Sequence, residues 1–95
     1  MLASDRVDVS EICGSISGRT VDKYAKAQLR TRPADKVKVP LIEVCLATLE
    51  CRLVAQHEVG DHILFVGEIV AAHQGDPKSP LVYYEGKYAD IVSQT

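Results

Sequence analysis

The sequence lacks three features that would assign it to a broad class at once: an excess of basic residues, a long apolar run and closely paired cysteines. Its formal net charge of −2 provides no basic surface, so we expect no nucleic-acid partner. No apolar stretch approaches the roughly 20 residues that a helix needs to cross a bilayer, and the first residues do not form a signal peptide. We therefore expect a cytoplasmic protein with no membrane partner.

The cysteines argue against a disulfide framework and against a zinc knuckle. They are odd in number, widely spaced and without a CxxC pair: Cys13, Cys45 and Cys51. We predict that Cys45 and Cys51 lie in or beside strands as small buried side chains. The three histidines are also dispersed, at His57, His62 and His73. They could bind a metal only if the fold gathered them, so we expect no metal site.

The length and composition are those of one small domain. The chain has 95 residues, of which 46% are hydrophobic and 25% charged, an ordinary balance for a globular protein. The sequence has no internal repeat and no low-complexity run. We expect a single domain over residues 1–95.

The longest structural signal is a β-hairpin between Glu50 and His73. Two runs rich in branched and aromatic residues flank an acidic turn at Glu58 to Asp61. A loop of four to five residues would place Val54 opposite Phe65. The second run is apolar on both faces except at Glu68, which is typical of a strand covered on both sides, as in a barrel or a tight dimer. Phe65 is then expected to be a core residue, and Gly67 to mark a bend or a close approach.

The remaining elements are short. We predict a helix from Arg6 to about Cys13, capped by Ser4 or Asp5, and a helix from Val21 to about Leu29, capped by Thr20. Extended pieces follow at residues 37–39 and 41–44, 81–84 and 88–92. The fold class is therefore mainly β, with about five strands and two short helices near the N-terminus.

The segment Gly14 to Thr20, GSISGRT, is a candidate anion site. Small residues let backbone N–H groups face a phosphate, a following helix start adds partial positive charge, and Arg19 and Lys23 add full charges. It is not a P-loop, because no GK[ST] closes it. The alternative is a solvated linker between two helices.

The turn Gly60-Asp61-His62 is a second candidate. His62 could donate a hydrogen bond to a carbonyl or phosphate group. The alternative is a plain hairpin turn in which Asp61 bonds to nearby backbone. Glu68 needs a partner in its apolar strand, and Arg52 on the opposite strand is the expected one.

Four stretches together resemble the flavin reductase-like family, and within it the flavoredoxin-type proteins. They are ICGSISGRTVDKY (12–24), VKVPLIEVCLATLECRLV (37–54), GDHILFVGEIVAAH (60–73) and PLVYYEGKYADI (80–91). The SGRxxDK and GDHxLFxGEV patterns are the most specific parts. Thr20 stands where the family commonly has an acidic residue.

The resemblance implies a split β-barrel that binds FMN, usually as a homodimer with the flavin near the subunit interface. Ser17, Gly18, Arg19 and Lys23 would then lie near FMN, and Asp61 and His62 near the nicotinamide of NAD(P)H. No side chain need act as a nucleophile, so no catalytic residue is assigned. The resemblance also implies an electron acceptor, either free flavin or a redox protein.

Family domains are about twice as long, and the resemblance matches their C-terminal half. We therefore expect a partial split barrel without the family's N-terminal strands. Its unpaired edges and uncovered apolar face favour a homodimer or a higher oligomer. Two functions stay open: an FMN-binding flavin reductase-like protein, or a truncated, non-catalytic relative that keeps the dimerising β-core and binds no flavin.

Overall fold

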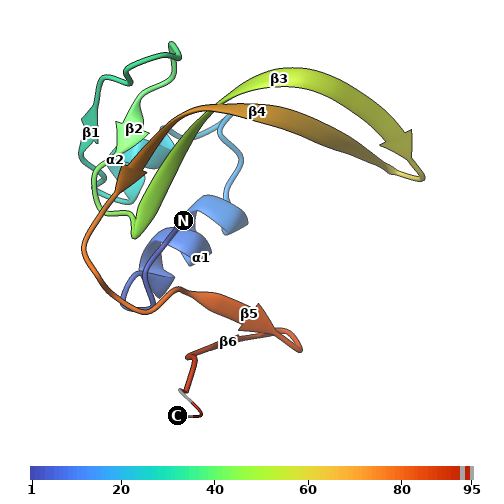
Figure 1. Ribbon diagram of the computed structural model, residues 1–95. Coiled ribbons are helices and arrows are strands. Elements are labelled where there is room, and N and C mark those ends of the chain that lie inside the picture. Colours follow the sequence, from blue (N-terminus) through green and yellow to red (C-terminus); the bar gives the residue numbers. More distant parts are fainter. Residues whose placement is uncertain (93, 95) are drawn as a thin grey trace.

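The computed structural model describes residues 1–92 and 94, and one long curved hairpin dominates it (Figure 1). The elements in chain order are α1 (Val7–Ser15), α2 (Lys23–Lys26), β1 (Thr31–Arg32), β2 (Leu41–Ile42), β3 (Ala47–Val59), β4 (His62–Gln74), β5 (Val82–Tyr84) and β6 (Lys87–Ala89). The strands form three antiparallel two-stranded sheets, β1–β2, β3–β4 and β5–β6. The prediction of a mainly β chain with two short helices near the N-terminus is confirmed. No helix among these residues has the length and apolar character of a membrane span.

The β3–β4 hairpin turns through two residues, Gly60 and Asp61, because the strands pair as far as Val59 and His62. The φ of Gly60 is 62°, whereas the φ of Asp61 lies outside the left-handed region. This combination is the pattern of a type II′ turn. The predicted longer loop is wrong. Its register is wrong too, since Phe65 lies opposite Gln56 and not opposite Val54.

Two irregularities curve this hairpin into an arch (Figure 1). The register shifts between Glu50 and Cys51, and again between Leu53 and Ala55. Gly67 lies opposite Leu53 at the second shift, where a Cβ would stand 3.1 Å from the Cβ of Cys51. Such shifts bend a strand and increase its twist. The bend and close approach predicted at Gly67 are confirmed.

The predicted partner of Glu68 is also confirmed. Arg52 faces Glu68 across the hairpin, and their Nη2 and Oε2 atoms are 3.4 Å apart. Both side chains are more than half exposed. The pair therefore fixes a surface contact and contributes little to stability.

Helix α1 forms where expected, but its predicted cap is wrong. Its N-cap is Arg6, with no side-chain hydrogen bond, and the helix continues through Gly14 to Ser15. Ser4 and Asp5 are engaged elsewhere, because the Ser4 N–H donates to the carbonyl of Ser79 and Asp5 pairs with Lys78. Contacts with Lys78 and Ser79, which are distant in the sequence, thus take the place of the local cap.

Helix α2 is shorter than predicted and begins at a different cap. The carboxylate of Asp22 accepts from the N–H groups of Tyr24 and Ala25. Thr20, the predicted cap, instead donates through its N–H and its hydroxyl to the carbonyl of Ser17. The turn after Ser17 therefore delays the helix by two residues, from Val21 to Lys23, and leaves Asp22 as its N-cap.

The extended piece predicted at residues 37–39 does not become a strand. Thr31–Arg32 pairs with Leu41–Ile42 instead. The N–H groups of Asp35, Lys36 and Val37 bond to the carboxylate of Glu50, so these groups do not join a sheet ladder. The last hairpin is close to prediction, with β5 and β6 joined through a two-residue turn at Glu85 and Gly86.

The N-terminal segment ties the two ends of the arch together. Leu2 bridges to Cys45 before β3, and Ala3 bridges to Pro80 after β4. Gly75 lies at the same junction, where its N–H donates to the Leu46 carbonyl. A Cβ at Gly75 would stand 1.9 Å from the Cys45 carbonyl oxygen, so only glycine fits.

Little of the chain is buried. The buried apolar residues are Ala3, Val9, Ala27 and Leu41, all outside the large hairpin. Nine large apolar residues of the hairpin are 41–60% exposed, and Phe65 is the most exposed of them: Leu49, Leu53, Val54, Val59, Ile63, Leu64, Phe65, Val66 and Ile69. The expectation that Phe65 is a core residue and that the second strand is covered is wrong for the single chain. Cys51 is exposed and Cys45 half-buried, so the prediction of buried cysteines fails for Cys51.

The junction at Gly75 yields a stability prediction. We expect Gly75→Ala to lower the free energy of unfolding by about 1–3 kcal/mol, because the new Cβ displaces the Cys45 carbonyl and strains the junction. Gly14→Ala is the matched control. It adds a Cβ with no atom within 4 Å, inside α1, and should raise stability by about 0.5–1 kcal/mol. Equal urea midpoints for the two variants would contradict this account of the junction.

Candidate functional site

The loop between α1 and α2 forms a compact turn around Ser17. The Ser17 carbonyl accepts hydrogen bonds from Thr20 and Val21, and its hydroxyl oxygen accepts from the N–H of Arg19. An open hollow of about 540 Å³ lies beside it, lined by the consecutive residues from Gly18 to Tyr24. The structure therefore brings together Gly18, Arg19 and Lys23 of the predicted flavin segment, with Ser17 directly adjacent.

The two cations of this loop are held differently. Lys23 donates from Nζ to the Cys13 carbonyl at 2.6 Å, near the C-terminal end of α1, where a helix favours positive charge. Arg19 is exposed, and its guanidinium makes no hydrogen bond or ion pair with any residue that the structure describes. Arg19 is thus free to meet an anion, whereas Lys23 is already positioned.

Helix α2 contributes less to an anion site than the sequence suggests. It has one turn, and the carboxylate of Asp22 takes the N–H groups of Tyr24 and Ala25. Asp22 also lines the hollow. Any anion bound here would depend mainly on Arg19 and Lys23, and not on the helix start.

The second predicted segment lies at the tip of the β3–β4 hairpin. Asp61 Oδ1 and His62 Nδ1 are 2.6 Å apart, and the side chains are 93% and 83% exposed. The tip lies across the molecule from α2 (Figure 1). One chain therefore does not bring Asp61 and His62 to the loop of residues 17–23.

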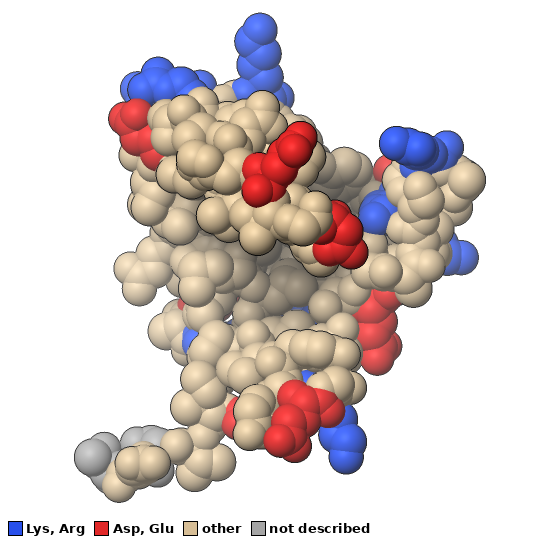
Figure 2. All heavy atoms as spheres, turned by 90° about the vertical axis from the view of Figure 1, so that its right-hand side faces the viewer, with Lys and Arg blue, Asp and Glu red and all other residues tan. Residues whose placement is uncertain are grey.

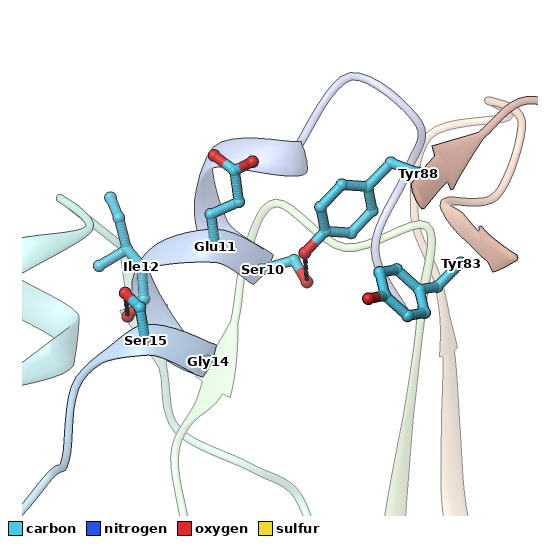
Figure 3. Close-up of a pocket in the computed structure, with 7 residues that line it drawn as sticks. All are labelled: Ser10, Glu11, Ile12, Gly14, Ser15, Tyr83 and Tyr88. Atoms are coloured by element: carbon cyan, nitrogen blue, oxygen red, sulfur yellow. Dashed lines mark hydrogen bonds between the residues drawn. The ribbon is translucent and has the colours of Figure 1, made fainter. Parts of the chain in front are cut away.

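A further hollow, of about 570 Å³, lies between α1 and the β5–β6 hairpin (Figure 3). Tyr83 and Tyr88 meet edge to face with ring centroids 5.3 Å apart, and the Tyr88 hydroxyl bonds to Ser10 Oγ at 2.9 Å. The lining residues are Ser10, Glu11, Ile12, Gly14, Ser15, Tyr83 and Tyr88. No local pattern in the sequence indicates that α1 faces these tyrosines.

Sequence reasoning missed the most buried polar group, Glu50. Its side chain is fully buried at the base of the hairpin and accepts from three backbone N–H groups and from His73 Nε2. Burial alone would raise the pKa of Glu50, but the bond from His73 and those from Lys36, Asp35 and Val37 together lower it to about 2. The sequence signal that could have identified Glu50 is its place inside a predicted strand, because a buried carboxylate requires hydrogen-bond partners.

Comparison with known proteins identifies the family. The model of the flavin reductase like domain matches residues 1–92. The chain belongs to this family. The flavin reductase resemblance of the four sequence blocks is thereby confirmed, and the β-rich arrangement is the fold of its solved members.

The relatives also show how much of a family member this chain covers. An NADH-dependent flavin reductase of Rhodococcus is 42% identical over 53 residues, which are 56% of this chain and 30% of that protein. An FMN-binding protein of Thermus thermophilus, solved with cyclohexenone, is 33% identical with a TM-score of 0.81, over 99% of this chain and 57% of that one. Component B of a nitrilotriacetate monooxygenase from Mycobacterium thermoresistibile is 28% identical with a TM-score of 0.83, over 97% and 49%. The chain thus spans about half the length of these solved structures.

The Glu50 network predicts a loss of stability in acid. Because the folded-state pKa lies near 2 and the ordinary value is 4.5, the ionised form stabilises the fold above the ordinary value, and this contribution is lost as the pH falls towards 2. We expect Glu50→Gln to lower the melting temperature at neutral pH and to flatten its decline between these pH values. Lys78 and Arg6 lower the pKa of exposed Asp5 and Asp8, which adds a background slope to both proteins. Thermal unfolding of wild type, Glu50→Gln and the exposed control Glu43→Gln measures the difference; identical slopes in all three would exclude this role.

Proposed function

We propose that this protein binds FMN and acts in electron transfer from NAD(P)H, as a flavin reductase or as a carrier of bound flavin. The observation that carries the proposal is the Ser17–Lys23 segment of a flavin reductase family member, folded into a compact turn beside an open hollow with a free guanidinium. Relatives named as an NADH-dependent flavin reductase and an FMN-binding protein support the cofactors. Bound FMN would accept a hydride from NAD(P)H and release electrons to an acceptor.

The chain's own part would be to bind and orient an anion. Arg19 would pair with the FMN phosphate, and Lys23 would supply a second charge from a position fixed by the Cys13 carbonyl. The N–H of Gly18 itself would complete the contact, because the N–H groups of Arg19, Thr20 and Val21 already bond to Ser17. These residues bind and orient, and none is assigned a covalent step.

We propose further that the protein acts as a homodimer and that the hairpin forms the interface. Its nine exposed apolar side chains lie on both faces of the arch, as a strand covered on both sides requires. Figure 2, viewed towards the hairpin tip, shows a largely uncharged surface with a recess beneath the arch. Asp61 and His62 at the tip would then contact nicotinamide at the flavin of the partner subunit.

Two relatives by name belong to monooxygenase systems, as a reductase subunit and as component B. We therefore propose that the electron acceptor is an oxygenase partner or the free flavin that such a partner uses.

The competing function is a dimerising module without flavin. It is favoured by one observation, the Asp22 carboxylate that lines the hollow beside Arg19 and Lys23. Flavin absorbance retained after gel filtration with FMN would exclude the module.

The cation assignment predicts selective losses of FMN affinity. Arg19→Ala and Lys23→Ala should each cost about 1–2 kcal/mol, which is roughly a five- to thirtyfold higher dissociation constant, because each removes a charge-assisted bond to phosphate. Fluorescence quenching of FMN measures it, with Lys87→Ala on β6 as the control. Riboflavin, which lacks the phosphate, should bind all four proteins alike. Equal FMN affinities for wild type and Arg19→Ala would remove Arg19 from the site.

The interface assignment predicts a change of oligomeric state. Phe65→Asp should weaken self-association by at least about 2 kcal/mol, because a buried unpaired carboxylate replaces an aromatic contact. Val39→Asp is the matched control, since Val39 is 64% exposed on a loop outside the hairpin. Sedimentation velocity over a concentration series distinguishes them. A monomeric wild type, or a dimer indifferent to Phe65→Asp, would refute the hairpin interface.

A further inference from the structure

Three side chains with metal-binding atoms converge at the base of the β3–β4 hairpin, away from the predicted flavin segment. His73 Nε2 on β4 is 2.5 Å from Glu50 Oε2 on β3 and 3.7 Å from Asp35 Oδ2 on the loop after β1. All three atoms lie within 4.8 Å of one another. The flavin function proposed above uses none of them.

The charge of this cluster is not balanced by a fixed cation. Within residues 1–92 and 94, the ion-pair partner of both Glu50 and Asp35 is His73 alone, and no lysine or arginine lies within 4.0 Å of either carboxylate. Two carboxylates thus share one imidazole, and one of them is fully buried. Buried charges are ordinarily paired or bound to a metal ion.

One hydrogen bond of Glu50, the one from His73, could be exchanged for an ion if the two side chains moved apart. Glu50 Oε1 accepts from Lys36 and Val37, and Oε2 accepts from the N–H of Asp35. The remaining position on Oε2 faces His73 Nε2. An ion between these two atoms would replace the shared imidazole proton and keep all three backbone bonds. The proton of the neutral imidazole would then reside on Nδ1.

We propose that Asp35, Glu50 and His73 bind one Zn²⁺ ion, with water at the remaining position. One imidazole nitrogen and two carboxylate oxygens form a donor set that suits zinc, and zinc keeps an open position where three protein ligands are present. Ligand atoms at zinc's usual bond lengths stand roughly 3.4 Å apart. The 3.7 Å between His73 and Asp35 is close to this value, and the His73–Glu50 pair would widen to reach it.

Such an ion would clamp the loop of residues 33–38 to both strands of the hairpin. Asp35 is the side chain that can adjust, because it is 65% exposed whereas His73 is 17% exposed. Its backbone N–H holds Glu50, but its carboxylate does not. Asp35→Asn therefore removes a zinc ligand and leaves the structural network intact.

Calorimetric titration of the metal-free, untagged chain with ZnCl₂ tests the site without flavin. We expect one ion per chain, a dissociation constant raised roughly tenfold or more by Asp35→Asn, loss of binding in His73→Asn, and a higher melting temperature with zinc. His57→Asn, an exposed histidine on β3, is the control and should bind as wild type does.

Three results would overturn the site. They are the absence of saturable binding at millimolar zinc, an affinity unchanged by Asp35→Asn, and a loss of binding in His57→Asn. Circular dichroism checks that each variant is folded. If His73→Asn does not fold, the Asp35→Asn titration still decides. MgCl₂, which favours oxygen ligands alone, should not compete.

Discussion

The buried carboxylate of Glu50 is the interaction on which the arrangement of this chain depends. An ionised group in a fully buried position is unfavourable unless it is bonded, and here three N–H groups and one imidazole bond to it. Those N–H groups belong to the 33–38 loop, which therefore follows a path set by one side chain. The loop in turn leaves Thr31–Arg32 to pair with Leu41–Ile42. This polar network thus holds the 33–38 loop against the base of the hairpin.

Beyond this anchored base, the large apolar side chains of the hairpin are left exposed by the part of the chain that the structure describes. Full burial of a large apolar side chain contributes about 1.5–3 kcal/mol, so the roughly half-exposed side chains of β3 and β4 leave about 1 kcal/mol each unrealised. Summed over nine residues, that amount is comparable to the whole stability of a typical domain, about 5–15 kcal/mol. Covering the arch is therefore the largest favourable change open to the molecule. The second subunit proposed above would supply such a surface.

The parts of the fold predicted from sequence are those determined by neighbouring residues. The place of the turn at Gly60-Asp61, though not its length, the close approach at Gly67 and the Arg52–Glu68 pair follow from spacing within one hairpin. The errors arise where a distant group competes. Asp5 pairs with Lys78 and so does not cap α1, and Glu50 takes the N–H groups of a predicted strand. Glu50 and His73 are 23 positions apart, and no local pattern shows that a strand's bulges will align them. For the site, residues 17–20 could be predicted as a loop, but not the bond from Lys23 to Cys13.

The positions of the two predicted ligand segments link binding to association. The loop of residues 17–23 is fixed near the end of α1, whereas Asp61 and His62 lie at the far tip of the arch (Figure 1). A ligand pair that contacts both segments must therefore bridge two chains. If it does, flavin binding and dimer formation share one coupling free energy, and each must strengthen the other by the same factor. The exposed hairpin would then serve both purposes, because the strands that need an apolar cover would also bring Asp61 and His62 to the flavin of the neighbouring subunit.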